Sequence, residues 1–291
     1  MAITDLRGTK FLVTGAASGI GRALALQAAE EGAELVLTDL SADGLAEAVR
    51  QVEDSGGAVL HSAALDIADY DAVASFASDV HSRCGSLDIV ANVAGVSVWG
   101  TVDRLEHKHW RQMVDVNLMG PIHVIESFVP PMMKAGRGGH LVNVSSAAGL
   151  LALPWHSAYS ASKFGLRGVS EVLRFDLKRD GIGVSLVVPG AVRTPLVDSV
   201  QIVGVDRDRP EVRKITERFV AHAATPEKVA RCIVTGIKKN RFLVYTSFDT
   251  RFGYWWARKF APPYNLVMQA ANDYFRRVVT PRASARRADG G

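Results

Sequence analysis

A glycine-rich turn between an apolar run and an alanine-rich segment constrains the fold of this chain more than any other feature. Lys10–Val13 is the apolar run, Thr14–Arg22 reads TGAASGIGR, and Ala23–Glu31 is rich in helix-forming residues. Glycines permit a tight turn and let the backbone approach a phosphate closely, and a helix N-terminus attracts its negative charge. The segment therefore predicts a strand, a phosphate-binding loop and a helix. The residues expected at the phosphates are Gly15, Ser18, Gly19, Ile20 and Gly21.

Strand-like and helix-like patterns alternate along the rest of the chain. The further apolar runs are Leu35–Leu37, Val59–Leu65, Leu87–Val93, Leu141–Val144, Val184–Val188 and Phe242–Tyr245. The helical patterns between them are 41–55, Asp69–Cys84, Glu106–Lys134, the segment from Tyr159 to about Arg179, and Pro226–Lys239. Strands that alternate with helices need right-handed crossovers, which place helices on both faces of a parallel sheet. We expect an α/β fold with a doubly wound parallel sheet of about seven strands.

Asp39 follows the second predicted strand and indicates which dinucleotide binds. It lies 18 residues beyond Gly21. A carboxylate at this point accepts hydrogen bonds from an adenosine ribose and repels a 2′-phosphate. Because Ser18 and Leu40 provide no arginine for such a phosphate, the pattern favours NAD over NADP. An alternative role for Asp39 is to cap the next helix, although Ser41 competes for that position.

The segment Asn143–Lys163 carries the candidate chemistry. Tyr159 and Lys163 are four residues apart in a helical pattern, so both side chains lie on one face. An ammonium close to a phenol favours the phenolate, so we expect Lys163 and a cationic ring to lower the pKa of Tyr159 from about 10 towards neutrality. Ser146 follows the strand at Leu141–Val144, and its hydroxyl is able to hold a substrate oxygen opposite the phenol. A tyrosine and lysine at this spacing are common in helices, so the rest of the chain decides the interpretation.

A proline interrupts the long helical pattern at Glu106–Lys134. Pro121 has no amide hydrogen and cannot donate to the carbonyl of Asn117. We therefore expect a kink at Asn117 and a free main-chain carbonyl that is able to hold a water molecule.

Composition excludes several classes of protein. Of the 291 residues 48% are hydrophobic, which is ample for a core, and no apolar stretch approaches the length of a membrane span. Neither Cys84 nor Cys232 belongs to a metal-binding or redox motif, and the eight histidines show no ligand spacing, so no metal is expected. The N-terminus lacks a cationic region followed by an apolar run, which favours a cytoplasmic protein.

The C-terminal region differs in composition from the rest. Residues 251–291 carry eight arginines and lysines against two aspartates, a net charge of +6 within a total of +4, and no nucleic-acid motif accompanies them. Eleven of the 22 aromatic residues fall between Phe242 and Phe275. Apolar residues from Leu266 to Val278 follow a helical period. This stripe favours docking on the chain's own domain or on a sister subunit, and peripheral membrane contact is the alternative.

With these motifs in order, the chain resembles a single-domain short-chain dehydrogenase/reductase over about residues 8–245. The motifs are TGxxxGxG at Thr14–Gly21, Asp39, Asp66, Asn92-x-Ala94-Gly95, Asn117, Ser146, YxxxK at Tyr159–Lys163, and Pro189-Gly190. The resemblance implies a Rossmann-type fold, a homodimer or homotetramer, and a hydride transfer between nicotinamide and a secondary alcohol or ketone. It assigns catalysis to Asn117, Ser146, Tyr159 and Lys163.

The resemblance also implies how the ligands bind. In addition to the glycine loop and Asp39, the resemblance assigns dinucleotide binding to Asp66, Ile67, Asn92, Ala94, Gly95, Tyr159, Lys163, Pro189, Gly190, Val192 and Thr194. The substrate side would be formed by Ser146, Val96, Val98, Leu153, Trp155, His156 and Leu196, an apolar set that favours a bulky hydrophobic alcohol. One departure is Val93, where the family usually has a second asparagine.

The predicted organisation has three parts, and two other functions remain open. Residues 1–245 form the catalytic domain with a substrate loop at about 194–224, residues 246–281 an aromatic amphipathic extension, and residues 282–291 a disordered tail. The alternatives to an NAD-dependent dehydrogenase are an NADP-linked carbonyl reductase and a dinucleotide-binding protein without catalysis.

Overall fold

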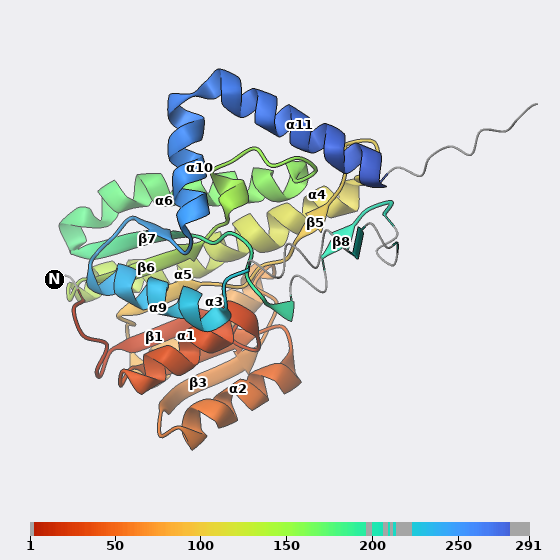
Figure 1. Ribbon diagram of the computed structural model, residues 1–291. Helices are drawn as coiled ribbons and strands as arrows, with labels where there is room; N and C mark the ends of the chain where they lie inside the picture. The colour runs from red at the N-terminus through yellow and green to blue at the C-terminus, as the bar shows by residue number, and fades with distance from the viewer. Residues whose placement is uncertain (1–2, 196–199, 206–208, 210–211, 214–222, 280–291) are drawn as a thin grey trace, which may run out of the picture.

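The computed structural model describes residues 3–195, 200–205, 209, 212–213 and 223–279, and a seven-stranded parallel sheet forms its centre (Figure 1). The strand order is β3-β2-β1-β4-β6-β7-β9, and every neighbouring pair is parallel. The strands are β1 Lys10–Thr14, β2 Glu34–Asp39, β3 Ala58–Ala64, β4 Ile89–Asn92, β6 Gly139–Val144, β7 Ile182–Val188 and β9 Leu243–Tyr245. The predicted fold class is confirmed, including the number of strands in this sheet.

Helices cover both faces of the sheet. One face carries α1 Gly19–Glu30, α2 Ala42–Asp54 and α9 Pro226–Lys238, which pack through residues such as Leu24 and Ile233. The other face carries α3 Tyr70–Cys84, α5 Gly120–Ala135 and α6 Ser157–Asp176. The chain changes faces after β3, so the strand order reverses between β1 and β4. The carboxyl ends of these two strands form the crevice where open α/β sheets bind ligands.

A π-helical turn interrupts the long helical pattern at the predicted place. Helix α4 His107–Val114 continues into the π-helix Asp115–Met119 and then into α5. The amide of Gly120 donates to the carbonyl of Asp115, five residues back. The expected interruption at Asn117 is therefore present, as a widened turn next to a proline that cannot donate.

Short elements that the sequence patterns do not predict lie at the edge of the crevice. Strand β5 Val98–Trp99 pairs in parallel with β8 Gln201–Ile202, and the 3₁₀ turn η2 Ala147–Gly149 follows β6. A second 3₁₀ turn, η3 Leu177–Asp180, ends α6. Most of the predicted substrate loop at 194–224, including Leu196, lies outside the described residues.

Two helices follow the last strand. Helix α10 Phe248–Lys259, which the sequence patterns do not predict, rises from the sheet, and α11 Ala261–Val279 runs along the top of the molecule (Figure 1). Pro262 and Pro263 lie in the first turn of α11, where a missing amide hydrogen leaves no helical bond unmade. No helix within the described ranges is both long and apolar enough to cross a membrane.

Candidate active site

The glycine loop meets the end of β4 at the point where the strand order reverses. Thr14 Oγ1 accepts hydrogen bonds from the amides of Val93 at 3.0 Å and Ala94 at 3.2 Å. Gly15 has a φ of 71°, and a Cβ on it would lie 2.8 Å from the backbone of Ala94. Only glycine fits this conformation and this spacing.

The N-terminus of α1 fits a pyrophosphate. Ser18 stands at the N-cap, but its side chain makes no capping hydrogen bond, and the first turn contains no acidic residue. The main-chain amides of the first turn of α1 are therefore available to an anion. Gly19, with a φ of 52°, lies so close to Thr194 that a Cβ would come within 2.9 Å of that side chain. The glycine loop and Thr194 thus lie in contact, and together with the N-terminus of α1 they form what we call the cradle.

Asp39 supports the glycine loop and does not cap α2. Its Oδ2 accepts from the amide of Ala17 and its Oδ1 from the amide of Ser41, both at 2.9 Å. Ser41 is the N-cap, since its hydroxyl accepts from Gly44. Of the two interpretations of Asp39, the cofactor-related one fits this position at the end of β2, because each oxygen keeps a lone pair free.

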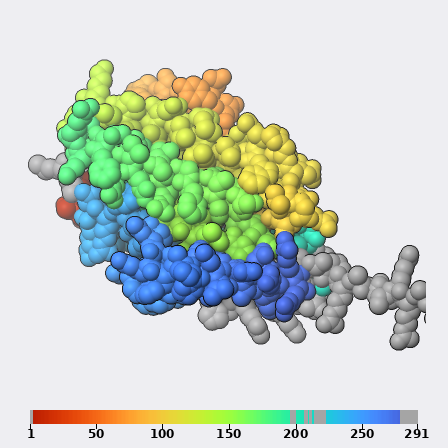
Figure 2. All heavy atoms as spheres, turned by 90° about the horizontal axis from the view of Figure 1, so that it is seen from above, coloured from red at the N-terminus to blue at the C-terminus, as the bar shows by residue number. Residues whose placement is uncertain are grey.

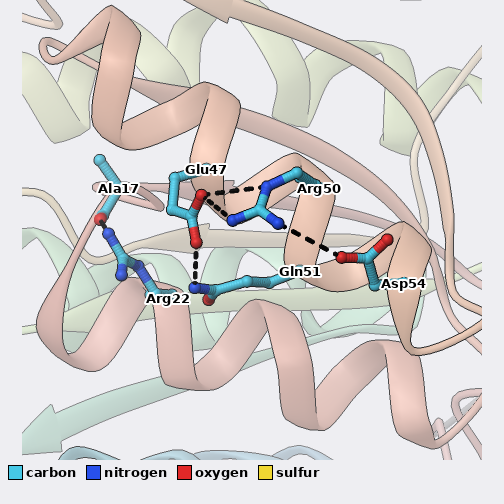
Figure 3. A network of polar contacts seen from close by, with 6 residues as sticks. All are labelled: Ala17, Arg22, Glu47, Arg50, Gln51 and Asp54. Atoms are coloured by element: carbon cyan, nitrogen blue, oxygen red, sulfur yellow. Dashed lines mark hydrogen bonds and ion pairs between the residues drawn. The ribbon is translucent and has the colours of Figure 1, made fainter.

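Two arginines near this end of the loop are engaged within the protein (Figure 3). Arg22 donates to the carbonyl of Ala17. Arg50 donates to Glu47 and pairs with Asp54 at 3.7 Å, and Glu47 also accepts from Gln51. Arg50 is therefore paired with two carboxylates, whereas Arg22 makes one hydrogen bond to a neutral carbonyl and has no acidic partner among the described residues.

Asp66 and Ile67 stand at the end of β3. Asp66 Oδ1 accepts from the amide of Ala68 at 2.9 Å, and the carbonyl of Ile67 accepts from His123 Nδ1 at 3.0 Å. The Ile67 side chain is buried against Gly120, where a Cβ would clash with it. The turn after β3 is therefore fixed from both sides.

Asn92 has a different setting from the one that the motif implies. Its side chain is buried, donates to Asn143 Oδ1 at 2.9 Å and to the carbonyl of Pro121 at 3.4 Å. Asn143 in turn donates to Ser170 on α6 at 2.9 Å. This row of amides joins β4, β6 and α6, so the Asn92 side chain braces the sheet beneath the crevice.

Ser146 lies close enough to Tyr159 for its hydroxyl to lower the pKa of the phenol. Tyr159 is buried, and burial raises the pKa of Tyr159 above its usual value, a shift that the Ser146 hydroxyl opposes. The expected lowering is thus not produced by the protein groups alone. Ser146 also caps the turn after β6, because its hydroxyl accepts from the amide of Ala148 at 3.1 Å.

Lys163 is buried one turn along α6 from Tyr159. Its Nζ lies 5.9 Å from the Tyr159 ring centroid and donates to the carbonyl of Val144 at 3.0 Å. Burial lowers the pKa of Lys163 from 10.5 to about 8. Gly95 leaves space for the ammonium, since a Cβ there would lie 3.4 Å from Nζ.

Asn117 lies beside Gly95 and is fully buried. Its side-chain oxygen accepts from the amide of Val96, and its side-chain nitrogen donates to the carbonyl of the same residue, both at 2.9 Å. Its side-chain nitrogen also lies 3.3 Å from the Ser162 hydroxyl. The amide therefore holds the strand end after β4 against α6, which leaves only the main chain of Asn117 for other partners.

Four of the predicted substrate residues lie near Tyr159. Val96, Val98 and Leu153 pack in the same apolar cluster as the tyrosine. The His156 ring lies 6.2 Å from the Tyr159 ring, and burial lowers the pKa of His156. Trp155 lies next to His156 in a backbone conformation with a φ of 67°, which is rare for a bulky residue.

Two further aromatic residues join this group that sequence reasoning missed. Trp99 packs on His156 with ring centroids 4.3 Å apart, and Phe275 of α11 packs on Trp155 at 6.1 Å. The Tyr264 hydroxyl of α11 also accepts from the amide of Ala152 at 2.9 Å. Trp99 directly follows Val98, so the sequence could have identified it as a neighbour of the site. Phe275 could not be identified in this way, because only the path of α11 brings it to Trp155.

The segment after β7 lies opposite the glycine loop. The carbonyl of Pro189 accepts from the amide of Ala147, and Gly190 leaves space for Thr250, whose hydroxyl a Cβ would approach to 3.2 Å. Val192 is buried and pairs with Ala224 as an isolated bridge. No cluster of three potential metal ligands occurs in the part of the chain that the structure describes.

The lowered pKa of Lys163 predicts a pH-dependent stability. Its folded-state pKa of about 8 is below the ordinary 10.5, so the unfolded chain binds more protons between these values and the free energy of unfolding rises with pH across them. The rise is at most about 3 kcal/mol. We expect denaturant unfolding of the wild type, from pH 8 to 10.5, to show this gain relative to Lys163→Met. Parallel pH curves for the two proteins would contradict it.

Comparison with known proteins gives consistent matches. The profile of a family described as short chain dehydrogenase matches residues 9–202. SadH of Mycobacterium tuberculosis strain H37Rv is 35% identical over 251 residues, which cover 86% of this chain and 90% of the relative.

Two solved structures extend the likeness to bound dinucleotides. A short chain dehydrogenase/reductase from Burkholderia phymatum in complex with NAD has a TM-score of 0.81 and 27% identity, covering 90% of this chain and 96% of its own. A metagenomic short-chain oxidoreductase in complex with NADP has a TM-score of 0.65 and 30% identity, and the match covers 82% of this chain and 96% of the oxidoreductase. The two complexes support a nicotinamide dinucleotide as the class of cofactor.

Proposed function

The chain belongs to the short-chain dehydrogenase family of oxidoreductases, and we propose that it transfers a hydride between NAD(H) and a secondary alcohol or its ketone. One observation carries this proposal: Tyr159 is buried, close to the Ser146 hydroxyl, and one helical turn from a buried Lys163. Families of binding proteins that lose catalysis would not need to keep this arrangement. The glycine loop Gly15–Gly21, Asp39 and Thr194 support the same cofactor, because they lie together at the N-terminus of α1.

Each catalytic side chain has a distinct role in the proposed reaction. When bound, the nicotinamide supplies the hydride acceptor or donor. Tyr159 removes the proton of the alcohol or returns it to the ketone, while Ser146 holds the same oxygen. Lys163 binds the nicotinamide ribose, and its positive charge favours the Tyr159 phenolate. The main-chain carbonyl of Asn117 holds a water molecule next to Lys163, which extends the path for the proton.

The substrate proposed is bulky and hydrophobic. Val96, Val98 and Leu153 provide apolar surface beside Tyr159, and Trp99 and Trp155 enlarge it. Sites that bury aromatic and aliphatic walls favour apolar ligands with few polar groups. Helix α11 contributes to this site in the proposal, because Phe275 packs on Trp155, so the extension after residue 245 belongs with the substrate side.

We expect the Asp39→Ala variant to bind NADP more tightly relative to NAD. The carboxylate repels a 2′-phosphate, and it accepts hydrogen bonds from an unmodified ribose. Removing it therefore weakens NAD and strengthens NADP binding, which titration of protein fluorescence with each dinucleotide measures. Asp43→Ala, on the first turn of α2, is the matched control and should leave the preference unchanged. An unchanged NADP-to-NAD ratio in Asp39→Ala would refute the assignment of NAD.

A graded series of secondary alcohols, from short-chain to steroid-sized, tests the proposed function. The purified protein is assayed with NAD and with NADP, and nicotinamide absorbance is followed. We expect kcat/KM to rise with apolar size and to be higher with NAD. A small polar polyol as the best substrate would overturn the pocket argument. Tight binding of NADH without turnover of any member would favour a dinucleotide-binding protein.

A further inference from the structure

Helix α10 presents aromatic side chains to solvent along its whole length. Phe248, Phe252 and Trp255 follow helical spacing on one face, and Phe260 continues the row after the helix ends. They are 75%, 49%, 50% and 47% exposed. Successive ring centroids are 5.8 to 5.9 Å apart, so the four rings form one continuous surface, which we call the aromatic face. Surface patches of this kind mark interaction sites.

The packing of α10 fixes which way this face points. Thr250 and Tyr254, on the opposite side of the helix, are 5% and 9% exposed. The Arg167 guanidinium of α6 lies 5.4 Å from the Tyr254 ring centroid. Ser247 caps the helix by accepting from the amide of Thr250. Because the inner side is anchored in this way, the helix cannot turn its aromatic residues inward. Figure 2 shows α10 and α11 as a blue ridge on the surface, with the green α6 beside it.

A cationic groove borders the aromatic face. It has a volume of about 550 Å³ and lies between α9, β9 and the start of α10. Lys228, Arg231, Arg241 and Arg251 line it, and no acidic residue does. Among the described residues no ion pair engages any of these four cations. Arg251 lies three residues after Phe248 in α10, so a cation of the groove and the aromatic face meet at the start of the helix.

We propose that the aromatic face and the cationic groove together dock the protein on an anionic membrane surface. Aromatic rings partition into the boundary between headgroups and acyl chains, and arginines and lysines beside them attract anionic headgroups. A second copy of the chain fits this surface less well. A two-fold interface brings the same patch of both copies together, and the groove offers no acidic side chain to pair with the cations of the other copy. Lys259, on the last turn of α10, adds a positive charge near Trp255 and Phe260.

Flotation of the full-length protein with lipid vesicles tests the inference. Vesicles of phosphatidylcholine alone are compared with vesicles that also contain phosphatidylglycerol, at low and high salt. We expect flotation with the anionic vesicles at low salt, little with the neutral ones, and a loss at high salt because ions screen the charges. Phe252→Ser/Trp255→Ser should lower the vesicle partition coefficient at least roughly tenfold. Arg241→Gln/Arg251→Gln should lower it by about fivefold for each cation removed.

Controls separate this surface from the active site and from other occupants. Phe175→Ser, which replaces a 64% exposed aromatic on α6, should float like the wild type. Turnover of a water-soluble alcohol should be unchanged in the surface variants, so failure of the proposed catalysis is distinguishable from failure of docking. Each variant's thermal unfolding confirms that it is folded. Absence of wild-type flotation would overturn the proposal. So would a wild-type dimer that dissociates in Phe252→Ser/Trp255→Ser.

Discussion

Tyr159→Phe is expected to lower kcat for alcohol oxidation by roughly 10²- to 10⁴-fold, the usual contribution of a positioned acid–base group. The substitution removes only the phenol hydroxyl, which lies close to Ser146. The ring remains, so its packing against Val98 and His156 is kept and the protein should fold normally. NADH titration by fluorescence, together with steady-state kinetics, separates the loss of chemistry from a loss of binding. We expect the dissociation constant of NADH to change little.

Tyr70→Phe is the matched control for this substitution. Tyr70 begins α3 and is 50% exposed, so loss of its hydroxyl should leave kcat unaltered. Ser146→Ala should lower kcat as well, because its hydroxyl holds the substrate oxygen in the proposed reaction. If Tyr159→Phe kept the wild-type rate, another group would carry the proton and the assignment of Tyr159 as acid–base residue would be wrong.

Gly21→Ala is expected to weaken NAD binding by roughly 100-fold, which corresponds to about 2.7 kcal/mol. A Cβ at this position would lie 1.9 Å from the carbonyl oxygen of Gly15. No side-chain rotation relieves this contact, so the loop and the first turn of α1 must separate. The cradle at the N-terminus of α1 then opens and the protein loses roughly 1–3 kcal/mol of stability. Isothermal titration with NAD and chemical denaturation measure the two effects.

Gly168→Ala, on a different helix, is expected to have the opposite effect on stability. Gly168 lies within α6, and a Cβ there meets no atom within 4 Å. Alanine is a better helix former than glycine, so this variant should be about 0.5–1 kcal/mol more stable than the wild type, with unchanged NAD affinity. Wild-type NAD affinity in Gly21→Ala would show that the dinucleotide binds elsewhere.

Local patterns predicted the parts of the fold that depend on local chemistry. The strand at Lys10–Thr14, the glycine loop and the helix after it follow directly from residue type and spacing. Pro121 located the interruption at Asn117 for a similar reason, because a missing amide hydrogen acts within one turn. The sheet followed from the alternation of strands and helices, which permits few topologies.

Elements that depend on long-range contacts could not be predicted from local sequence patterns. Strand β5 pairs two residues with β8, about a hundred positions later, and so short a strand has no period to detect. Helix α10 was missed because its aromatic residues point outward and its polar Thr250 points inward, the reverse of the usual amphipathic pattern. The apolar stripe of α11 was expected to dock on the chain's own domain or on a sister subunit; Phe275 contacts Trp155, whereas Leu266 is 68% exposed.

In the candidate site, too, some features follow from the local sequence and others depend on long-range contacts. Ser146, Tyr159 and Lys163 lie within one stretch of the sequence and were identified from their spacing. Whether the Asn92 side chain faces the cofactor or the interior depends on Asn143, a partner on another strand. The pKa of Tyr159 depends on burial as well as on charge, and no spacing reports the extent of burial.

Transfer of deuterium tests the central claim most directly. The best secondary alcohol of the size series is labelled with deuterium at its carbinol carbon and incubated with NAD and the enzyme, and the reduced nicotinamide is examined by mass spectrometry. The account predicts one deuterium in each reduced nicotinamide with the wild type, and almost none with Tyr159→Phe over the same time. Oxidation of the alcohol without deuterium in the nicotinamide, or equal transfer by Tyr159→Phe, would contradict it.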